Sequence, residues 1–262
     1  MKEVEKHPYD FQLIPVRLLT VNKAYQRPAH EKEINDIMSN FDYRLVNCIK
    51  VVPRDGLYYI WDGQQTASAL FSKYGENYLA PCLVYYDIDT SKQEAKLLVM
   101  ANTGSGAGKK MTPNQVWKAD LWADDETALR INSIVKKYGF NMDGKKDSKG
   151  RNISAVSAVK YAFANLTEAQ FNAVFRVISA AWDKDPDSVT APIIRGMSRF
   201  VKVYDGLFDE KNLVRRLSKK SAISVVRNGR ASYCKGDKKW AREIMSIYNN
   251  GTTTNRLPDL FA

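Results

Sequence analysis

The side chains best placed to do chemistry lie where a predicted strand turns into a predicted helix. Residues 58–61 are aromatic and β-branched, which indicates a strand, and residues 64–74 have a helical composition. Asp62 and Gly63 form a turn pair between the two elements. The first N–H groups of a helix have no partner within it, so such a turn aims them at one spot and favours an anion, especially phosphate. An ordinary strand-to-helix connection is the alternative.

Asp62 is the candidate catalytic residue of this turn. A metal-dependent phosphoryl reaction needs several converging carboxylates, whereas Asp55, Asp87 and Asp89 could equally be loop surface. An Asp before a turn Gly is also a common turn former. A divalent metal is therefore expected only if the site is catalytic, and no metal ligands are assigned.

A second candidate for phosphate binding is the glycine-rich stretch 102–110, which reads N-T-G-S-G-A-G-K-K. Asn102, Lys109 and Lys110 could wrap a phosphate, or the stretch could be a plain linker. It is not a Walker loop, because Lys110 stands where Ser or Thr should follow the lysine.

The charge of the chain is divided unevenly. The 262 residues have a net charge of +11, but residues 1–111 carry 14 Lys and Arg against 13 Asp and Glu. Residues 112–262 carry 26 against 16, so nearly all the excess lies in the second half. A basic half joined to a neutral one indicates a polyanionic partner, and we expect DNA.

Three short motifs, in order, resemble the ParB/sulfiredoxin superfamily over residues 10–115. An N-x-x-Q-R-like loop is formed by Asn22, Gln26 and Arg27. The G-E-R-R position is occupied by Gly63, Gln64, Gln65 and Thr66. Asn102 and the segment 111–113 are similar to the third motif, E-N-x-Q-R followed by L-x-P. The nearest resemblance is to ParB-like proteins (ParB N-terminal or ParB-like nuclease domains) of phages, plasmids and other mobile elements.

This resemblance implies a nucleotide or phosphate pocket. In ParB partition proteins the two arginines of G-E-R-R help to hold CTP, but Gln65 and Thr66 bring no charge here. Arg27, Lys109 and Lys110 are the cations that could compensate. Sulfiredoxin chemistry is excluded, because Gln64 stands in place of its reactive cysteine. Relatives also include nucleases and a branch that phosphorylates free serine.

The pattern of elements predicts an α+β fold. It comprises a small mixed-sheet domain over residues 1–111 and a basic all-helical domain over residues 112–262. In the first domain we expect strands at 11–16, 48–52, 58–61 and 81–86, and helices at 31–39, 64–74 and 91–101. Residues 129–138 and 153–163 could form a helix-turn-helix variant around the polar loop 143–151, or simply two packed helices. Residues 251–262 are expected to be a frayed tail.

The densest cationic stretch, residues 212–231, is the preferred DNA surface, and the loop 143–151 is the second choice. The DNA-contacting candidates are Lys145, Lys146, Lys149, Arg151, Arg215, Arg216, Lys219, Lys220, Arg227 and Arg230. Three scattered cysteines, no apolar run of membrane length and a charged N-terminus predict a cytoplasmic location without a membrane span. The sequence does not indicate the oligomeric state, and a homodimer is one option.

Three functions are therefore weighed. The first is a ParB-like DNA-binding protein with a nucleotide or phosphate pocket. The second is a nuclease or phosphotransferase that acts at the turn formed by Asp62, Gly63 and Gln64. The third is a non-catalytic interaction protein with a vestigial pocket.

Overall fold

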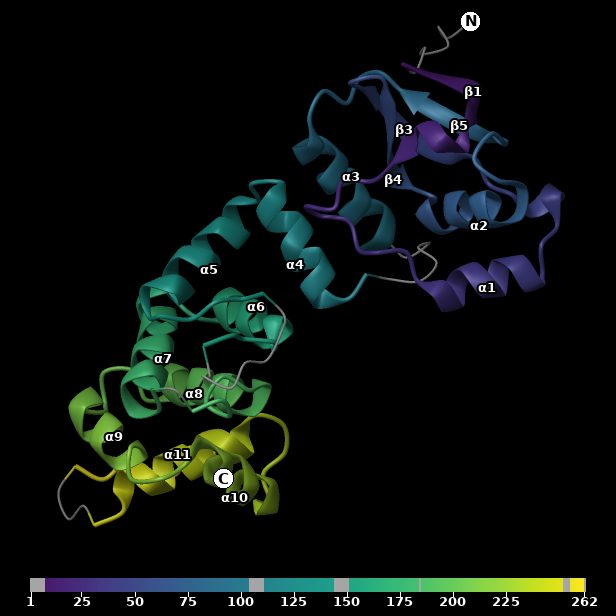
Figure 1. The fold of residues 1–262 in the computed structure, drawn as a ribbon. Helices are drawn as coiled ribbons and strands as arrows, with labels where there is room; N and C mark the ends of the chain where they lie inside the picture. Colours follow the sequence, from purple (N-terminus) through teal and green to yellow (C-terminus); the bar gives the residue numbers. More distant parts are fainter. Residues whose placement is uncertain (1–7, 104–110, 144–150, 184, 252–254, 262) are drawn as a thin grey trace, which may run out of the picture. The chain divides into compact units, whose positions relative to one another are not determined.

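The computed structural model describes residues 8–103, 111–143, 151–183, 185–251 and 255–261. The described residues form a mixed α+β fold with one five-stranded mixed sheet and eleven α-helices. The chain divides into two compact units, residues 1–125 and 126–262. Figure 1 shows the sheet in the first unit and only helices, apart from connecting segments, in the second.

The division falls after helix α4 (Pro113–Trp122), whereas the sequence suggested a boundary at residue 111. Ala119 of α4 and the following Ala123 pack with Tyr25 and with Leu98 of helix α3 (Ser91–Thr103), so α4 shares a core with the first unit. Thr112 caps α4 as expected: its side chain accepts a hydrogen bond from the Gln115 N–H, and the Gln115 side chain accepts one from the Thr112 N–H.

The sheet has the strand order β1-β5-β3-β4-β2. β1 pairs antiparallel with β5, and β3 with β4, whereas β3–β5 and β2–β4 are parallel. The elements of this unit before α4 are β1 (Tyr9–Pro15), η1 (Val16–Leu18), β2 (Leu19–Thr20), α1 (Glu31–Ser39), η2 (Tyr43–Leu45), β3 (Ile49–Arg54), β4 (Leu57–Asp62), α2 (Gln64–Tyr74), β5 (Leu79–Tyr85) and α3 (Ser91–Thr103).

The two faces of the sheet bury different residues, because neighbouring side chains of a strand point to opposite faces. Val51 and Ile60 pack with Leu70 of α2 on one face. Val52 and Trp61 pack on the other face, against Leu97 and Ala101 of α3. The strand–turn–helix of β4 and α2 is therefore held from both sides.

The second unit consists of packed helices built on amphipathic sequences. Its helices are α5 (Glu126–Lys137), α6 (Val156–Asn165), α7 (Glu168–Ala181), α8 (Ala191–Val203), α9 (Glu210–Leu217), α10 (Ala222–Ala231) and α11 (Lys238–Asn249). Trp240 of α11 lies against Gly196 of α8 and Gly229 of α10. These two glycines leave room for the indole, so the three helices approach closely.

The expectation of a frayed C-terminal tail is wrong for the described residues 255–261. Leu257 and Phe261 are buried, with 5% and 2% of their surface exposed. The Asn249 side chain donates to the Leu257 carbonyl (2.8 Å) and accepts from the Leu257 N–H (2.9 Å). Two buried apolar side chains and satisfied backbone groups explain why the segment packs onto the helices.

Within the described part of the chain, none of the helices combines the length and the apolar character needed to cross a membrane.

Candidate functional site

The turn after β4 has the geometry that its sequence indicates. Gly63 adopts φ +93° and ψ +18°, a left-handed conformation that glycine accepts readily, and α2 begins at the next residue. A Cβ on Gly63 would lie 3.2 Å from the Ile49 Cα of β3. Glycine is thus required twice, by the backbone angle and by the neighbouring strand. No side chain caps α2, so its first N–H groups remain available to a ligand.

A small cavity of about 220 Å³ lies at this turn. Its lining brings together nearly all the predicted phosphate-binding residues in the described part of the chain: Gln26, Arg27, Gly63, Gln64, Gln65, Thr66 and Asn102. Asp62, the candidate catalytic residue, lines it as well. Asn22 does not, since its side-chain oxygen accepts the Ala24 N–H (2.9 Å) and it lines a different hollow. Lys109 and Lys110 lie outside the described residues.

Much of the polar lining is already engaged. The buried Gln26 donates its amide to the Ile60 carbonyl (2.6 Å), which ties the loop before α1 to β4. Asn102 donates to the Leu98 carbonyl one turn earlier in α3 (2.8 Å). The Gln65 side-chain oxygen accepts the His30 N–H (3.2 Å), which leaves its NH₂ group able to donate to a ligand.

The charged groups around the cavity are paired with one another. The Asp62 carboxylate lies 3.0 Å from the Lys50 Nζ, and Arg27 lies 3.3 Å from the Glu33 carboxylate. In the described ranges, His, Cys, Asp and Glu side chains do not gather in threes or more as metal ligands would. The cavity therefore offers an anion hydrogen bonds from amides and a helix terminus, with little net positive charge.

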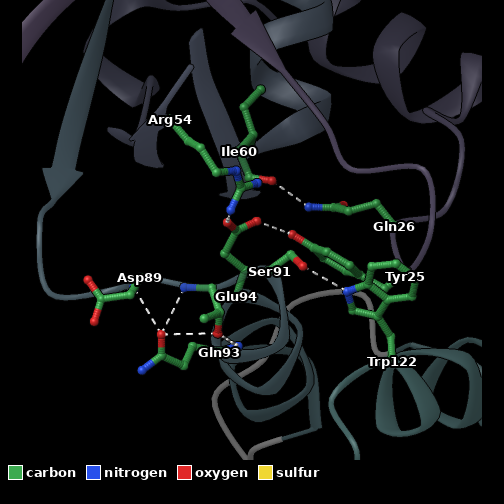
Figure 2. Close-up of polar contacts among 10 residues, drawn as sticks. Tyr25, Gln26, Arg54, Ile60, Asp89, Ser91, Gln93, Glu94 and Trp122 are labelled. Atoms are coloured by element: carbon green, nitrogen blue, oxygen red, sulfur yellow. Dashed lines mark hydrogen bonds and ion pairs between the residues drawn. The ribbon is translucent and has the colours of Figure 1, made fainter. Parts of the chain in front are cut away.

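A buried charge network beneath the loop was not foreseen from the sequence. Glu94 of α3 is fully buried, and it accepts hydrogen bonds from the Tyr25 hydroxyl (2.5 Å) and from the Arg54 guanidinium (2.6 Å) (Figure 2). The Arg54 guanidinium also lies over the Tyr59 ring, 4.0 Å from its centre. Burial and the hydrogen bond to Glu94 raise the pKa of Tyr25 well above its usual value. The network ties β3, α3 and the loop that carries Gln26.

The start of α3 has its own polar contacts, also drawn in Figure 2. The Gln93 side-chain oxygen accepts the N–H groups of Asp89 (2.9 Å) and Thr90 (3.0 Å). The Trp122 indole donates to the Ser91 hydroxyl (3.1 Å), which joins the end of α4 to the start of α3. The Thr90 hydroxyl accepts the Gln93 N–H (3.3 Å) and so caps α3, whereas no side chain caps α2.

Burial makes two of the three cysteines poor candidates for chemistry. Cys82 lies in the sheet core, where burial raises the pKa of its thiol to about 12. Cys234 is also buried, and its sulfur lies 3.5 Å from the Phe261 carbonyl oxygen.

The predicted DNA-contacting residues fall into two groups in the structure. Arg151 is bonded to Asp183 (3.2 Å) and to the Gly139 carbonyl, whereas Lys145, Lys146 and Lys149 lie outside the described residues. The other six lie on α9, on the connection 218–221 or on α10: Arg215, Arg216, Lys219, Lys220, Arg227 and Arg230. We call these six the α9–α10 cations.

Five of the α9–α10 cations are exposed, namely Arg215 and the four residues Lys219, Lys220, Arg227 and Arg230. No carboxylate in the described part of the chain pairs with any of these four. The remaining two are partly engaged, because Arg215 contacts Asn212 and Arg216 contacts the Asn250 carbonyl.

Two arginines on other helices of this unit are paired with carboxylates. Arg130 of α5 bonds Glu168 (2.6 Å), and Arg176 of α7 forms a two-point contact with Glu210 (2.6 and 2.7 Å). Arg130 and Arg176 are thus neutralised, whereas Lys219, Lys220, Arg227 and Arg230 pair with no carboxylate among the described residues.

A family model described as "Family of unknown function (DUF6551)" matches residues 21–261. The chain belongs to the DUF6551 family. The match includes both the β4–α2 turn and the α9–α10 cations, so both features lie inside the DUF6551 region. No curated protein matches the chain.

Proposed function

We propose that this DUF6551 protein binds DNA through the α9–α10 cations. The observation that supports this most directly is the set of exposed, unpaired side chains: Lys219, Lys220, Arg227 and Arg230. A cation that pairs with no carboxylate of the protein can bind a phosphate without breaking an ion pair. Clustered cations on one pair of helices are the electrostatic footprint of a nucleic-acid surface.

The connection between α9 and α10 suits this function. It is four residues long, 218–221, which is the length of the turn in helix-turn-helix motifs. On α10, Ile223, Arg227 and Arg230 are exposed and spaced by four and three residues, so they share one face of the helix. We assign α10 as the helix that enters the major groove. The segment between α5 and α6, where the sequence suggested such a motif, is much longer.

Both helices are anchored firmly enough to hold that surface. Leu213 and Leu217 of α9 are buried, as are Val225 and Val226 of α10. The Trp182 indole donates to the Lys220 carbonyl (2.7 Å), and the Asp185 carboxylate accepts the Ala222 N–H (3.1 Å). Removal of the exposed cations should therefore leave the fold unchanged.

The first unit fits a ParB/sulfiredoxin-like arrangement within this proposal. The order of loop, helix, strand, and strand–turn–helix, with Gln26 and Asn102 at one cavity, supports it. We propose that the cavity binds a phosphate group through the first N–H groups of α2. Its volume of about 220 Å³ lies below the roughly 300 Å³ at which ligand pockets usually begin, which favours a phosphate over a whole nucleoside triphosphate such as CTP.

The experiment for the main proposal is a fluorescence-anisotropy titration of the full chain with duplex DNA in about 0.1 M salt. Changing Arg227 and Arg230 to Ala together should weaken binding by on the order of ten- to thirtyfold, because two charge-assisted contacts are lost. Lys136 and Lys137 of α5, changed to Ala together, remove the same charge elsewhere in the unit and should have little effect. Equal losses in both variants, or no DNA binding by the unaltered protein, would refute the proposal.

A further inference from the structure

The second unit contains a hollow of about 890 Å³, roughly four times the volume of the cavity at the β4–α2 turn. Its walls are the end of α10, one side of α11 and the C-terminal segment 255–261, with Lys220 from the α9–α10 connection at one edge. Only Lys220 is shared with the α9–α10 cations, so the hollow is a separate feature of this unit.

The wall formed by the C-terminal segment is fixed by hydrogen bonds. The two bonds between Asn249 and Leu257 hold its start against α11, and Asn249 is itself buried. The Tyr204 hydroxyl of α8 donates to the Pro258 carbonyl (2.6 Å). The Asp259 carboxylate accepts the Phe261 N–H (3.0 Å) and so closes a local turn. The hollow is therefore shaped by packed chain on each of these sides.

The acidic residues that line the hollow are already occupied. Asp259 pairs with the Arg242 guanidinium (2.7 Å), and Glu243 accepts the Asn228 amide (2.9 Å). Burial acts to raise the pKa of Asp259, but the hydrogen bonds from Arg242 and from the Phe261 N–H, together with the charge of Arg242, keep that pKa below its usual range. Asp259 thus stays ionised and bound to Arg242.

The other cations of the lining are not neutralised. Lys220, Lys239 and Arg256 all line the hollow, and no carboxylate among the described residues pairs with them. Three positive side chains thus face the space, against one carboxylate, that of Glu243, whose partner Asn228 is neutral. The excess of positive charge in the lining favours an anion in the space.

We propose that this hollow binds phosphate groups, with Lys220, Lys239 and Arg256 as the residues that hold them. The proposal does not depend on the DNA surface, because Lys239 and Arg256 lie outside α9 and α10. The phosphate can come from a free phosphorylated molecule or from the backbone of a nucleic acid that passes over α10. The chemistry of recognition is the same in both cases.

The test uses the full chain and two ligands, pyrophosphate and duplex DNA. Calorimetry should show saturable binding of pyrophosphate by the unaltered protein and at least about tenfold weaker binding when Lys239 and Arg256 are both changed to Gln. Lys136 and Lys137 of α5, changed to Gln together, are the charge-matched control and should bind as the unaltered protein does. Circular dichroism confirms that each variant is folded.

The DNA measurement identifies the source of the phosphate. If the Lys239 and Arg256 variant loses affinity for DNA as well, the hollow holds backbone phosphates; if DNA affinity is unchanged, it holds a free phosphorylated ligand. Both results support the site. The proposal is overturned if the unaltered protein does not bind pyrophosphate saturably, or if the variant and the control bind it equally. Failure of the DNA function alone leaves the pyrophosphate result intact.

Discussion

Substitution of Gly63 tests whether the β4–α2 turn is as constrained as its geometry indicates. At φ +93° an alanine would carry the left-handed cost of roughly 1–2 kcal/mol. Its Cβ would also lie 3.2 Å from the Ile49 Cα, inside the normal carbon–carbon separation of about 3.5–4.0 Å, which adds on the order of 1 kcal/mol. Gly63→Ala should therefore destabilise the first unit by about 2–3 kcal/mol. Gly63→Val, with two more methyl groups beside Ile49, should cost more.

The matched control is Gly56, in the hairpin turn between β3 and β4. It also has a positive φ (+75°), but a Cβ there would meet no atom within 4 Å. Gly56→Ala should thus carry the backbone cost alone, about 1–2 kcal/mol. Hydrogen exchange of the β3 and β4 amides in the full chain gives the free energy of opening for each variant. Equal losses for Gly56→Ala and Gly63→Ala would show that the contact with Ile49 does not constrain the turn.

Three further predictions concern the cavity, the buried network and the helix packing. Gln65→Arg should strengthen pyrophosphate binding at the β4–α2 turn by about tenfold, because it restores a charge-assisted contact. Calorimetry measures this in the variant that lacks the Lys239 and Arg256 charges. Tyr25 has a raised pKa in the folded state, so above pH 10 its hydroxyl loses its proton in the unfolded state but keeps it in the folded state. The free energy of unfolding of the first unit should therefore fall by up to about 1.4 kcal/mol per pH unit. Tyr25→Phe should remove that slope in denaturation measured from pH 9 to 11. Gly196→Ala should destabilise the second unit by about 1–3 kcal/mol in thermal melts, because its Cβ would lie 2.6 Å from the Trp240 Cβ. This clash should exceed the stability that alanine gains over glycine inside a helix.

The local elements of the first unit could be predicted from the sequence because their signals are local. The helices predicted at 31–39 and 64–74 have those bounds in the structure, and Gly63 has the left-handed conformation that the turn required. The cavity at the turn could also be predicted from the sequence, because the three motifs that suggested it contribute residues to its lining. Whether that cavity binds a nucleotide or a phosphate stays a prediction.

Other features depend on contacts between residues far apart in the sequence. Glu94 looked like one more charge on an amphipathic helix, and only the fold brings it to Tyr25 and Arg54. The C-terminal residues 255–261 looked like a tail because Leu257 and Phe261 show no periodicity, yet both are buried. The basic stretch 212–231 is divided between two helices, because α9 ends at Leu217 and α10 begins at Ala222.

The salt dependence of DNA binding is the most direct test of the central claim. Each phosphate contact contributes about 0.9 to the slope of log affinity against log salt concentration. Titrations of the full chain with duplex DNA across a salt series should give a steep negative slope, and Arg227→Ala with Arg230→Ala should reduce its magnitude by about 1.8. The Lys136→Ala and Lys137→Ala control should keep the original slope. A slope that is flat in the unaltered protein, or that is the same in both double variants, would contradict the assignment of the α9–α10 cations as the DNA-binding surface.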